Sequence, residues 1–258
     1  MSDHAVTAEA ALIAFVDRML PQAGSPLVLG LCGAQGSGKS TLAAALARQF
    51  SGTATLSIDD LYLPREERQR LARDVHPLFA TRGVPATHDV PLGIATLSAL
   101  REGRQVRLPR FDKSRDDRLP EHEWPLSPPR ARLVVFEGWC VGARPIPSDV
   151  RPPINRLERD EDPDATWRRH WNAALGVHYP PLFAAIDKLA LLAAPSWDVV
   201  LGWRREQEAA LRPGPARMDE AALARFVDHY ERLTRHILSE MPARADLIIP
   251  LAEDRSIR

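Results

Sequence analysis

The sequence predicts an α/β protein with a mostly parallel sheet and helices on both of its faces. Short, uninterrupted apolar runs such as Leu27 to Cys32 and Leu133 to Phe136 are typical of strands buried on both sides. These runs alternate with segments of helical periodicity, a pattern that favours a parallel sheet covered by helices. Because 258 residues can enclose one substantial core, we expect a single domain over residues 1–258.

The first half of the chain begins with apolar side chains along one stripe of residues 5–20, which predicts an amphipathic helix within an N-terminal segment 1–22. Pro21 and Pro26 lie in the break that follows. The next expected elements are strand 27–32, helix 39–50, strand 53–58, helix 65–73, a loop over 75–90 and helix 91–102.

The second half contains more proline and longer loops. Residues 105–108 could form a strand, and the polar, proline-punctuated segment 109–130 is expected to be a lid or substrate loop. The later expectations are strand 133–136 ending at Glu137-Gly138, helices near 163–175 and 180–187, strands 189–192 and 198–201, helix 218–241 and strand 247–251. The long helix is amphipathic, with its apolar side chains on one face.

Composition excludes several classes of protein. The 34 basic and 34 acidic side chains give a net charge of zero, which argues against nucleic-acid binding and against membrane-surface binding. No apolar run approaches the ~18 residues of a membrane span, and Met1 to His4 do not begin a signal peptide. The two cysteines form no disulfide framework, so we expect a cytoplasmic protein. We also expect a monomer or weak homodimer.

The turn after the first strand carries the most specific motif. Residues 33–40 read Gly-Ala-Gln-Gly-Ser-Gly-Lys-Ser and match G-x-x-x-x-G-K-[ST] at each fixed position. Glycines let backbone N–H groups turn toward an anion, and the helix N-terminus adds positive charge. Lys39 would reach the β- and γ-phosphates, Ser40 would ligate Mg²⁺, and Thr41 could contact the α-phosphate. The motif predicts an ATP site in a three-layer P-loop NTPase fold, with the nucleotide held by Gly33, Ala34, Gln35, Gly36, Ser37, Gly38, Lys39, Ser40 and Thr41.

Carboxylates end two other strands. Glu137 follows the apolar run 133–136, at the position where a carboxylate can hold Mg²⁺. Asp59 and Asp60 follow strand 53–58, and in a parallel sheet they would lie at the same edge as the phosphate loop. A carboxylate there can accept the proton of a substrate hydroxyl or join the metal ligands, so Asp59 is predicted as base and as a third metal ligand beside Ser40 and Glu137. Which of the two aspartates is the base stays open.

Several stretches resemble a known family. Ser57-Ile58-Asp59-Asp60-Leu61-Tyr62 is similar to the segment after the second strand in the phosphoribulokinase/uridine kinase superfamily, where the first aspartate is the catalytic base. The chain also resembles the plant-type D-glycerate 3-kinase family and its fungal and bacterial relatives from about residue 27 to 255. That likeness rests on residues 82–89 (Arg-Gly-Val-Pro-Ala-Thr-His-Asp), 108–114 (Leu-Pro-Arg-Phe-Asp-Lys-Ser) and 136–139, with Trp203-Arg204, Gln207-Glu208 and Met218-Asp219-Glu220 near the C-terminus.

The loops of this resemblance offer groups for a small anionic substrate. Arginine suits a carboxylate because its planar fork binds both oxygens. Only three of the 34 basic side chains are lysines, and two of them, Lys39 and Lys113, fall in the proposed site. The predicted acceptor-binding residues are Asp60, Tyr62, Arg82, His88, Asp89, Arg110, Lys113 and Arg115.

The sequence thus indicates a kinase that transfers the γ-phosphoryl group of ATP to a hydroxyl of a small hydroxy acid. The resemblance implies D-glycerate as acceptor and 3-phosphoglycerate as product. We expect arginines of the 108–118 loop to close over the site as a lid. Two alternatives remain open: a related kinase with a nucleoside or pantothenate acceptor, and a P-loop ATPase or regulator without an acceptor. No [NT]-K-x-D motif is present, which counts against a GTPase.

Overall fold

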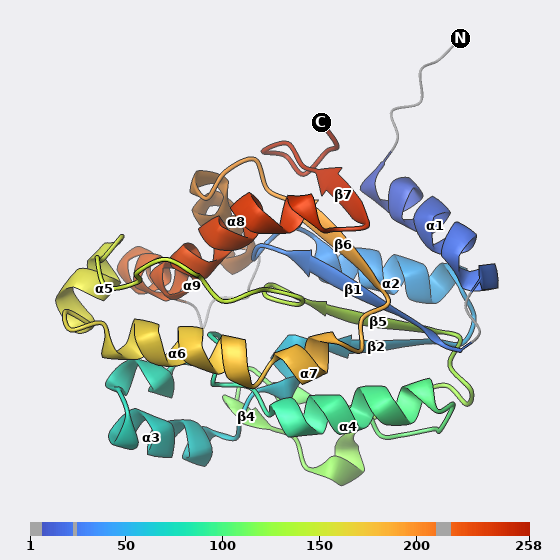
Figure 1. The fold of residues 1–258 in the computed structure, drawn as a ribbon, viewed down its shortest axis with the longest axis horizontal. Helices are drawn as coiled ribbons and strands as arrows, with labels where there is room; N and C mark the ends of the chain where they lie inside the picture. Colours follow the sequence, from blue (N-terminus) through green and yellow to red (C-terminus); the bar gives the residue numbers. More distant parts are fainter. Residues whose placement is uncertain (1–6, 23–24, 210–217) are drawn as a thin grey trace.

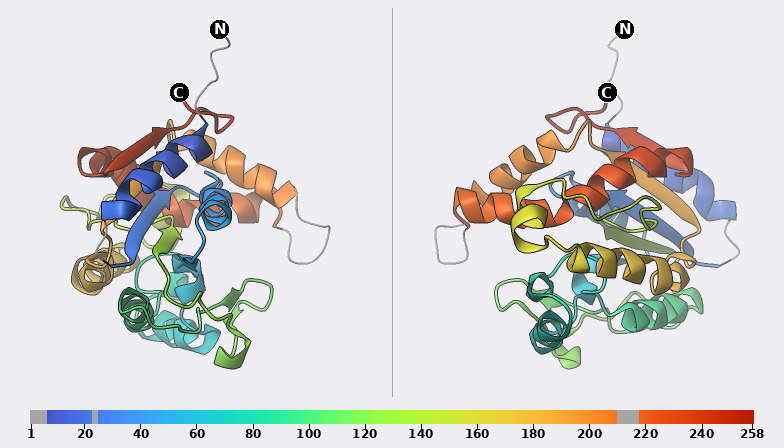
Figure 2. Two further views of the ribbon diagram at one scale, coloured as in Figure 1. Left: turned by 90° about the vertical axis from the view of Figure 1, so that its right-hand side faces the viewer. Right: turned by 60° about the vertical axis from the view of Figure 1, so that its left-hand side comes forward.

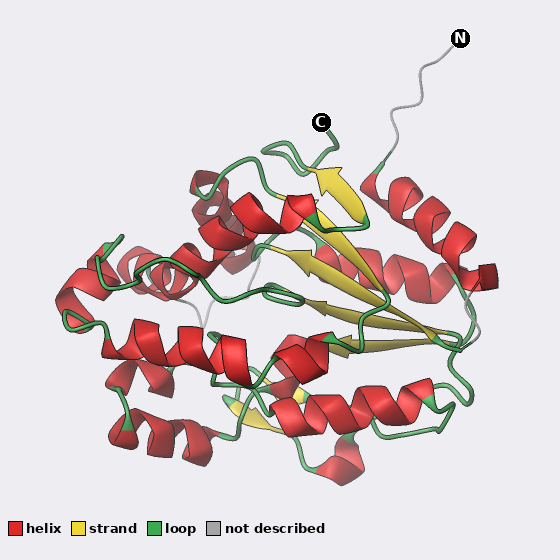
Figure 3. Cartoon of the chain, in the orientation of Figure 1, coloured by secondary structure: helices red, strands yellow, loops and turns green. Residues whose placement is uncertain are grey.

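The computed structural model describes residues 7–22, 25–209 and 218–258. Its centre is a five-stranded sheet in which all neighbouring strands are parallel, in the order β2-β5-β1-β6-β7 (Figures 1 and 3). The strands are β1 (Leu27–Gly33), β2 (Thr53–Ser57), β5 (Leu133–Gly138), β6 (Lys188–Ala193) and β7 (Leu247–Pro250). The predicted fold class, a parallel sheet within an α/β architecture, is confirmed.

Helices cover both faces of the sheet. Helix α2 (Lys39–Gln49) contacts β1, β2 and β5, and α1 (Ala8–Met19) packs beside it. Helices α6 (Thr166–Val177) and α9 (Glu220–Glu240) lie against the opposite face (Figure 2). The short α7 (Pro180–Phe183) brings the Phe183 ring against Phe136 of β5. These layers bury one continuous core that includes residues of α1, the sheet, α6 and α9.

The strand register sets up the site, because it aligns the carboxyl ends of three strands. Glu137 of β5 pairs with Ser57 of β2 on one side and with Leu31 of β1 on the other. The residues that follow these strands, Asp59 after β2 and Gly33 at the end of β1, therefore meet Glu137 at one edge of the sheet.

The segment between β2 and β5 lies below β2 in the view of Figure 1. It contains α3 (Arg65–Asp74), α4 (Val90–Arg101) and a hairpin of β3 (Phe111–Asp112) and β4 (Asp117–Arg118). Helix α4 begins where Asp89 accepts a hydrogen bond from the N–H of Leu92, an N-cap of the usual kind. The hairpin turns the loop of residues 109–130 back toward the end of β2.

Most elements match their predicted positions, including the long helix, which is α9, and the last strand, which is β7. Two predicted strands are wrong. Residues 105–108 form no strand, because the only ladder contact there is an isolated bridge between Arg107 and Leu126. Residues 198–201 open helix α8 (Asp198–Ala209): the apolar run looks like a strand, but Val200 and Trp203 are buried three residues apart, as on one side of a helix.

Smaller differences concern short elements. The predicted helix 180–187 is only α7, and the loop 75–90 contains a 3-10 turn over Pro77–Ala80. Helix α5 (Arg156–Glu161) was not predicted, because six residues with a single apolar side chain, Leu157, carry too little periodicity to identify it. The predicted N-terminal helix starts at Ala8, and its first two residues, 5 and 6, lie outside the described part of the chain. Across the described segments, no helix combines the length and hydropathy that crossing a membrane requires.

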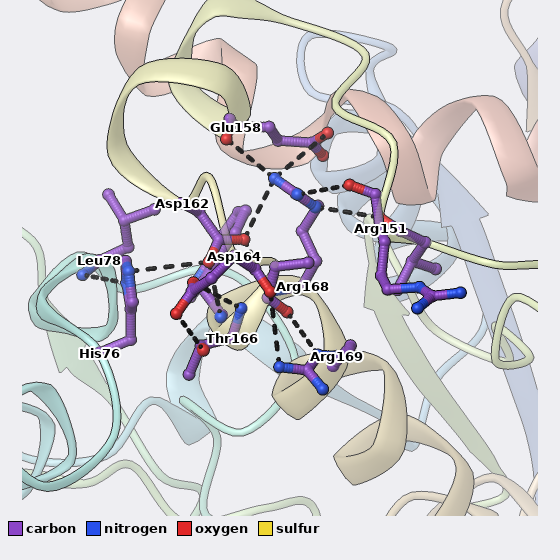
Figure 4. A network of polar contacts seen from close by, with 12 residues as sticks. His76, Leu78, Arg151, Glu158, Asp162, Asp164, Thr166, Arg168 and Arg169 are labelled. Atoms are coloured by element: carbon purple, nitrogen blue, oxygen red, sulfur yellow. Dashed lines mark hydrogen bonds and ion pairs between the residues drawn. The ribbon is translucent and has the colours of Figure 1, made fainter.

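A buried ionic network joins α5, α6 and α9, and Figure 4 shows its part around Arg168. The fully buried Arg168 guanidinium contacts the carboxylate of Asp162 at 3.2 Å and donates to the backbone carbonyls of Val150, Arg151 and Glu158. Glu158 in turn accepts from Arg232 of α9 at 2.5 Å. Each charge is therefore paired and hydrogen-bonded, as burial requires.

Candidate active site

The phosphate loop connects β1 to α2 in the conformation that its glycines allow. Gly36 and Gly38 have φ of +80° and +88°, in the left-handed region that favours glycine. Gly38 is the N-cap of α2, and the Lys39 ammonium donates to the carbonyl of Ala34 at 2.9 Å. Burial lowers the pKa of Lys39, while Glu137 and Asp59 oppose that effect. The hydroxyl of Ser37 is buried and has no hydrogen-bond partner within the described part of the chain, so a donor to a phosphate oxygen is available.

Two residues outside the motif, Trp203 and Arg255, contact this loop at Gly36. The Cβ of Trp203 lies so close to Gly36 that a Cβ at residue 36 would be 2.5 Å away. Arg255 donates from Nε to the Gly36 carbonyl at 2.7 Å, lies over the Trp203 ring and pairs with Glu206 at 2.6 Å. Trp203 is buried, and Arg255 was missed because no local pattern links residue 255 to residue 36.

Ser40 and Glu137 face each other beside the loop, with the Ser40 hydroxyl donating to Glu137 Oε1 at 3.1 Å. A hydroxyl and a carboxylate are the hard oxygen donors that suit Mg²⁺, so this pair fits the predicted metal role. Nowhere in residues 7–22, 25–209 and 218–258 do three or more His, Cys, Asp or Glu side chains form a ready-made metal cluster. The Ser40 and Glu137 oxygens fill only part of an octahedral Mg²⁺ shell, so water and nucleotide oxygens would supply the rest.

Asp59 follows β2 and has a partner on each carboxylate oxygen. The Tyr62 hydroxyl donates to Oδ1 at 2.6 Å, and the Lys113 ammonium contacts Oδ2 at 2.6 Å. Burial raises the pKa of Asp59, but the charge and hydrogen bond of Lys113 and the hydrogen bond of Tyr62 outweigh it and bring the pKa to about 2. Neither contact involves Ser40 or Glu137, so the role of Asp59 as a third metal ligand stays a prediction.

Asp60 holds the loop that carries Lys113. Its Oδ1 accepts from the N–H of Phe111, and its Oδ2 accepts from Arg110, both at 3.1 Å. Burial raises the pKa of Asp60, and Arg110 works against that increase. The two neighbouring aspartates therefore have different surroundings, and Asp60 ties the residue 109–130 loop to the end of β2.

Tyr62 and His88 form a stack beside Asp59. Their ring centroids are 4.9 Å apart, and Phe111 meets Tyr62 edge-on at 5.3 Å. His88 Nδ1 lies 2.6 Å from the hydroxyl of Tyr179, and burial lowers the pKa of His88 to about 4. The imidazole is therefore neutral at physiological pH.

The other predicted acceptor residues lie at different distances from this centre. Arg82 pairs with Asp116 and lies over the Phe111 ring. Asp89 caps α4 and pairs at 3.0 Å with Arg118, which also donates to the carbonyl of Tyr62. The Arg115 side chain is 71% exposed and contacts Asp112 at 3.4 Å. The structure thus brings Asp59, Asp60, Tyr62, His88, Arg110 and Lys113 together and leaves Arg115 at the surface.

Aromatic residues from distant segments complete the acceptor side. Tyr230 of α9 donates to the carbonyl of Arg82 at 3.2 Å, and Trp139 donates to the carbonyl of Gly83 at 3.1 Å. The rings of Tyr230 and Trp139 meet edge-on. Tyr230 gave no signal in the sequence beyond its place in the long amphipathic helix, and Tyr179, between two predicted helices, gave none.

Comparison with known proteins identifies one family model and several relatives. Residues 28–142 match the model of the phosphoribulokinase / uridine kinase family. An uncharacterized kinase of Schizosaccharomyces pombe, mug58, is 34% identical over 85% of this chain and 83% of its own. The chloroplastic D-glycerate 3-kinase of Arabidopsis thaliana is 31% identical over 90% of this chain, which spans only 54% of that protein.

A solved structure shows the same fold. D-glycerate 3-kinase from Cryptococcus neoformans superposes with a TM-score of 0.75 over 96% of this chain and 97% of that chain, at 23% identity. The family of this chain follows from the phosphate loop, the carboxylates at the ends of β2 and β5, and the extended similarity to the fission-yeast kinase. This chain belongs to the phosphoribulokinase/uridine kinase family of P-loop kinases.

Proposed function

We propose that this kinase transfers the γ-phosphoryl group of ATP to a hydroxyl of D-glycerate. The observation that carries the proposal is the pair of Lys113 and Asp59, whose charged atoms are 2.6 Å apart at the end of β2. The Lys113 side chain is 59% exposed, so its ammonium can turn from Asp59 to the carboxylate of an incoming acid. A neutral acceptor would offer nothing to replace that ion pair.

Asp59 suits the role of general base. Tyr62 is almost fully buried in its stack and keeps its hydrogen bond to Oδ1, whereas Oδ2 is held by the mobile partner. Oδ2 is therefore the oxygen that accepts the hydroxyl proton as the substrate oxygen bonds to phosphorus and the bond from phosphorus to the leaving ADP oxygen breaks. The products are ADP, a phosphate monoester and a proton, which Asp59 returns to solvent.

The phosphate loop and its neighbours account for the nucleotide. Lys39, the N–H groups of residues 33–40 and the Ser37 hydroxyl would hold the phosphates of ATP, with Ser40 and Glu137 as ligands of Mg²⁺. When bound, Mg²⁺ neutralises charge on the phosphate oxygens. The protein would position the two substrates and surround the transferred phosphoryl group with fixed charges and dipoles, which are the main requirements of phosphoryl transfer.

An acceptor screen tests the proposal. ATP consumption by the purified protein with Mg²⁺ is measured against D-glycerate, L-glycerate, glycerol, uridine and pantothenate. We expect a large response to D-glycerate and a small one to glycerol, which has the hydroxyls without the carboxylate. A response to uridine or pantothenate with none to D-glycerate would overturn the substrate. Hydrolysis that no acceptor stimulates would favour an ATPase.

A further inference from the structure

The hydrogen bonds around Tyr179 determine which nitrogen of His88 carries the proton. The Tyr179 side chain is buried, and its hydroxyl oxygen accepts from the backbone N–H of Ala86 at 3.1 Å. The same hydroxyl lies 2.6 Å from His88 Nδ1. His88 Nε2 is also buried and has no hydrogen-bond partner among the described residues.

The two neutral tautomers of His88 leave different groups unsatisfied. If Nδ1 carries the hydrogen, the O–H of Tyr179 and the bare Nε2 both lack a partner. If Nε2 carries the hydrogen, the Tyr179 O–H donates to Nδ1 and only Nε2–H remains unpaired. Because each buried polar group without a partner costs about 1–3 kcal/mol, the second arrangement is the favoured one.

The remaining donor belongs to a buried ring that lies beside the residues predicted to bind the acceptor. The His88 ring stacks on Tyr62, whose hydroxyl is 2.6 Å from Asp59 Oδ1. A hydrogen bond to the attacking oxygen would weaken it as a nucleophile, so a donor here suits an oxygen of the substrate that does not react. Resting on the function proposed above, we propose that Tyr179 is a positioning residue, which fixes His88 as the Nε2–H tautomer so that Nε2–H donates to a non-reacting oxygen of the acceptor.

Direct observation of the tautomer tests the first half of the proposal without any substrate. In ¹⁵N-histidine-labelled, ligand-free protein at neutral pH, we expect a pyrrole-type Nε2 and a pyridine-type Nδ1 for His88. A protonated Nδ1 would overturn the proposal. Because this readout needs no turnover, it stands even if D-glycerate is not the acceptor.

Kinetics of Tyr179→Phe test the second half with whichever acceptor the enzyme phosphorylates. The variant keeps the ring but frees the tautomer, so KM for the acceptor should rise about 5- to 10-fold, the effect of one neutral hydrogen bond. The kcat and the KM for ATP should stay within about twofold, because binding to a non-reacting oxygen is equal in the ground and transition states. Phe183→Leu is the control, since Phe183 packs on the Tyr179 ring without a hydrogen bond and should leave the acceptor KM unchanged.

A double variant separates positioning from packing. His88→Gln places an amide donor near the position of Nε2 and has no tautomer to fix. We expect its acceptor KM to lie closer to wild type than that of His88→Leu. Adding Tyr179→Phe to His88→Gln should change KM by less than about twofold. The same rise as in the wild-type background, or no rise in Tyr179→Phe alone, would overturn the proposal.

Discussion

At the scale of single residues, the two oxygens of Asp59 have different partners. Tyr62 is locked between His88 and Phe111, so its bond to Oδ1 fixes the orientation of the carboxylate. Lys113 is half exposed on a hairpin loop and can leave Oδ2. Asp60, the next residue in the chain, accepts hydrogen bonds from Phe111 and Arg110 and so holds the loop. The sequence alone left the choice between these neighbouring aspartates open, and this difference supports Asp59 as the proposed base.

Asp59→Asn should reduce kcat by about 10²- to 10⁴-fold, the usual contribution of a general base, and leave ATP binding nearly intact. Lys39→Ala should abolish transfer and weaken ATP binding as well. Turnover assays and nucleotide titrations of both variants check the prediction. Full turnover by Asp59→Asn would contradict the role of Asp59, and Asp60→Asn is the comparison that would then identify the base.

Acid should weaken the folded protein partly through Asp59. Its folded-state pKa of about 2 lies below the ~3.9 of an unfolded chain. The ion pair therefore stabilises the fold above about pH 4, and this stabilisation disappears as the pH falls toward 2. Because Lys113 is 59% exposed and screened by solvent, we expect only about 1–2 kcal/mol. Urea unfolding at pH 7 and pH 3 should show a smaller loss for Asp59→Asn than for wild type, and equal losses would contradict the prediction.

At the scale of elements, the sequence predicts what is local and misses what is distant. Spacing within a few residues is enough to predict the phosphate loop, β1, α2 and the carboxylates at the ends of β2 and β5. Residues 198–201 were wrongly predicted as a strand, because a four-residue apolar run is too short to show a helical or strand period. The burial of both Val200 and Trp203, three residues apart, fits the helix that the structure shows. Arg255 and Tyr179 contact the site across long stretches of sequence, which no local pattern encodes.

Two glycine substitutions test how α8 supports the phosphate loop. In Gly36→Ala the new Cβ would lie 2.5 Å from Trp203 Cβ at a φ of +80°, so we expect lower stability and at least about tenfold weaker ATP binding. Gly202→Ala, inside α8 with nothing within 4 Å of its Cβ, should stabilise the protein by about 0.5–1 kcal/mol and leave ATP binding unchanged. Thermal unfolding and ATP titration measure both, and equal ATP affinity in the two variants would contradict this account.

At the scale of the whole molecule, the sheet order and the register bring the site together, while the Arg168 network holds the outer helices (Figure 4). The α/β class and the parallel sheet were predictable, because alternation of apolar runs with helices repeats along the chain. The network was not, because its partners come from separate segments and each charge viewed alone resembles a surface residue.

Removing the central charge of this network should be severe. Arg168→Met leaves the buried carboxylate of Asp162 without its arginine, while Glu158 keeps only Arg232, so we expect a loss of about 3–5 kcal/mol in the free energy of unfolding. Arg169→Ala, one residue along α6 and exposed, should cost less than about 0.5 kcal/mol. Urea unfolding of the two variants makes the comparison, and a similar small loss in both would show that the network contributes little.

The central claim is that Lys113 receives the carboxylate of a small acid beside the base Asp59. The most direct measurement is kcat/KM of wild type and Lys113→Met with D-glycerate and with glycerol. We predict a fall of about 30- to 150-fold for D-glycerate in the variant, equivalent to about 2–3 kcal/mol for a charge-assisted hydrogen bond, and a fall of less than about threefold for glycerol. An equal fall for both substrates, or no phosphorylation of D-glycerate by the wild-type enzyme, would contradict the account.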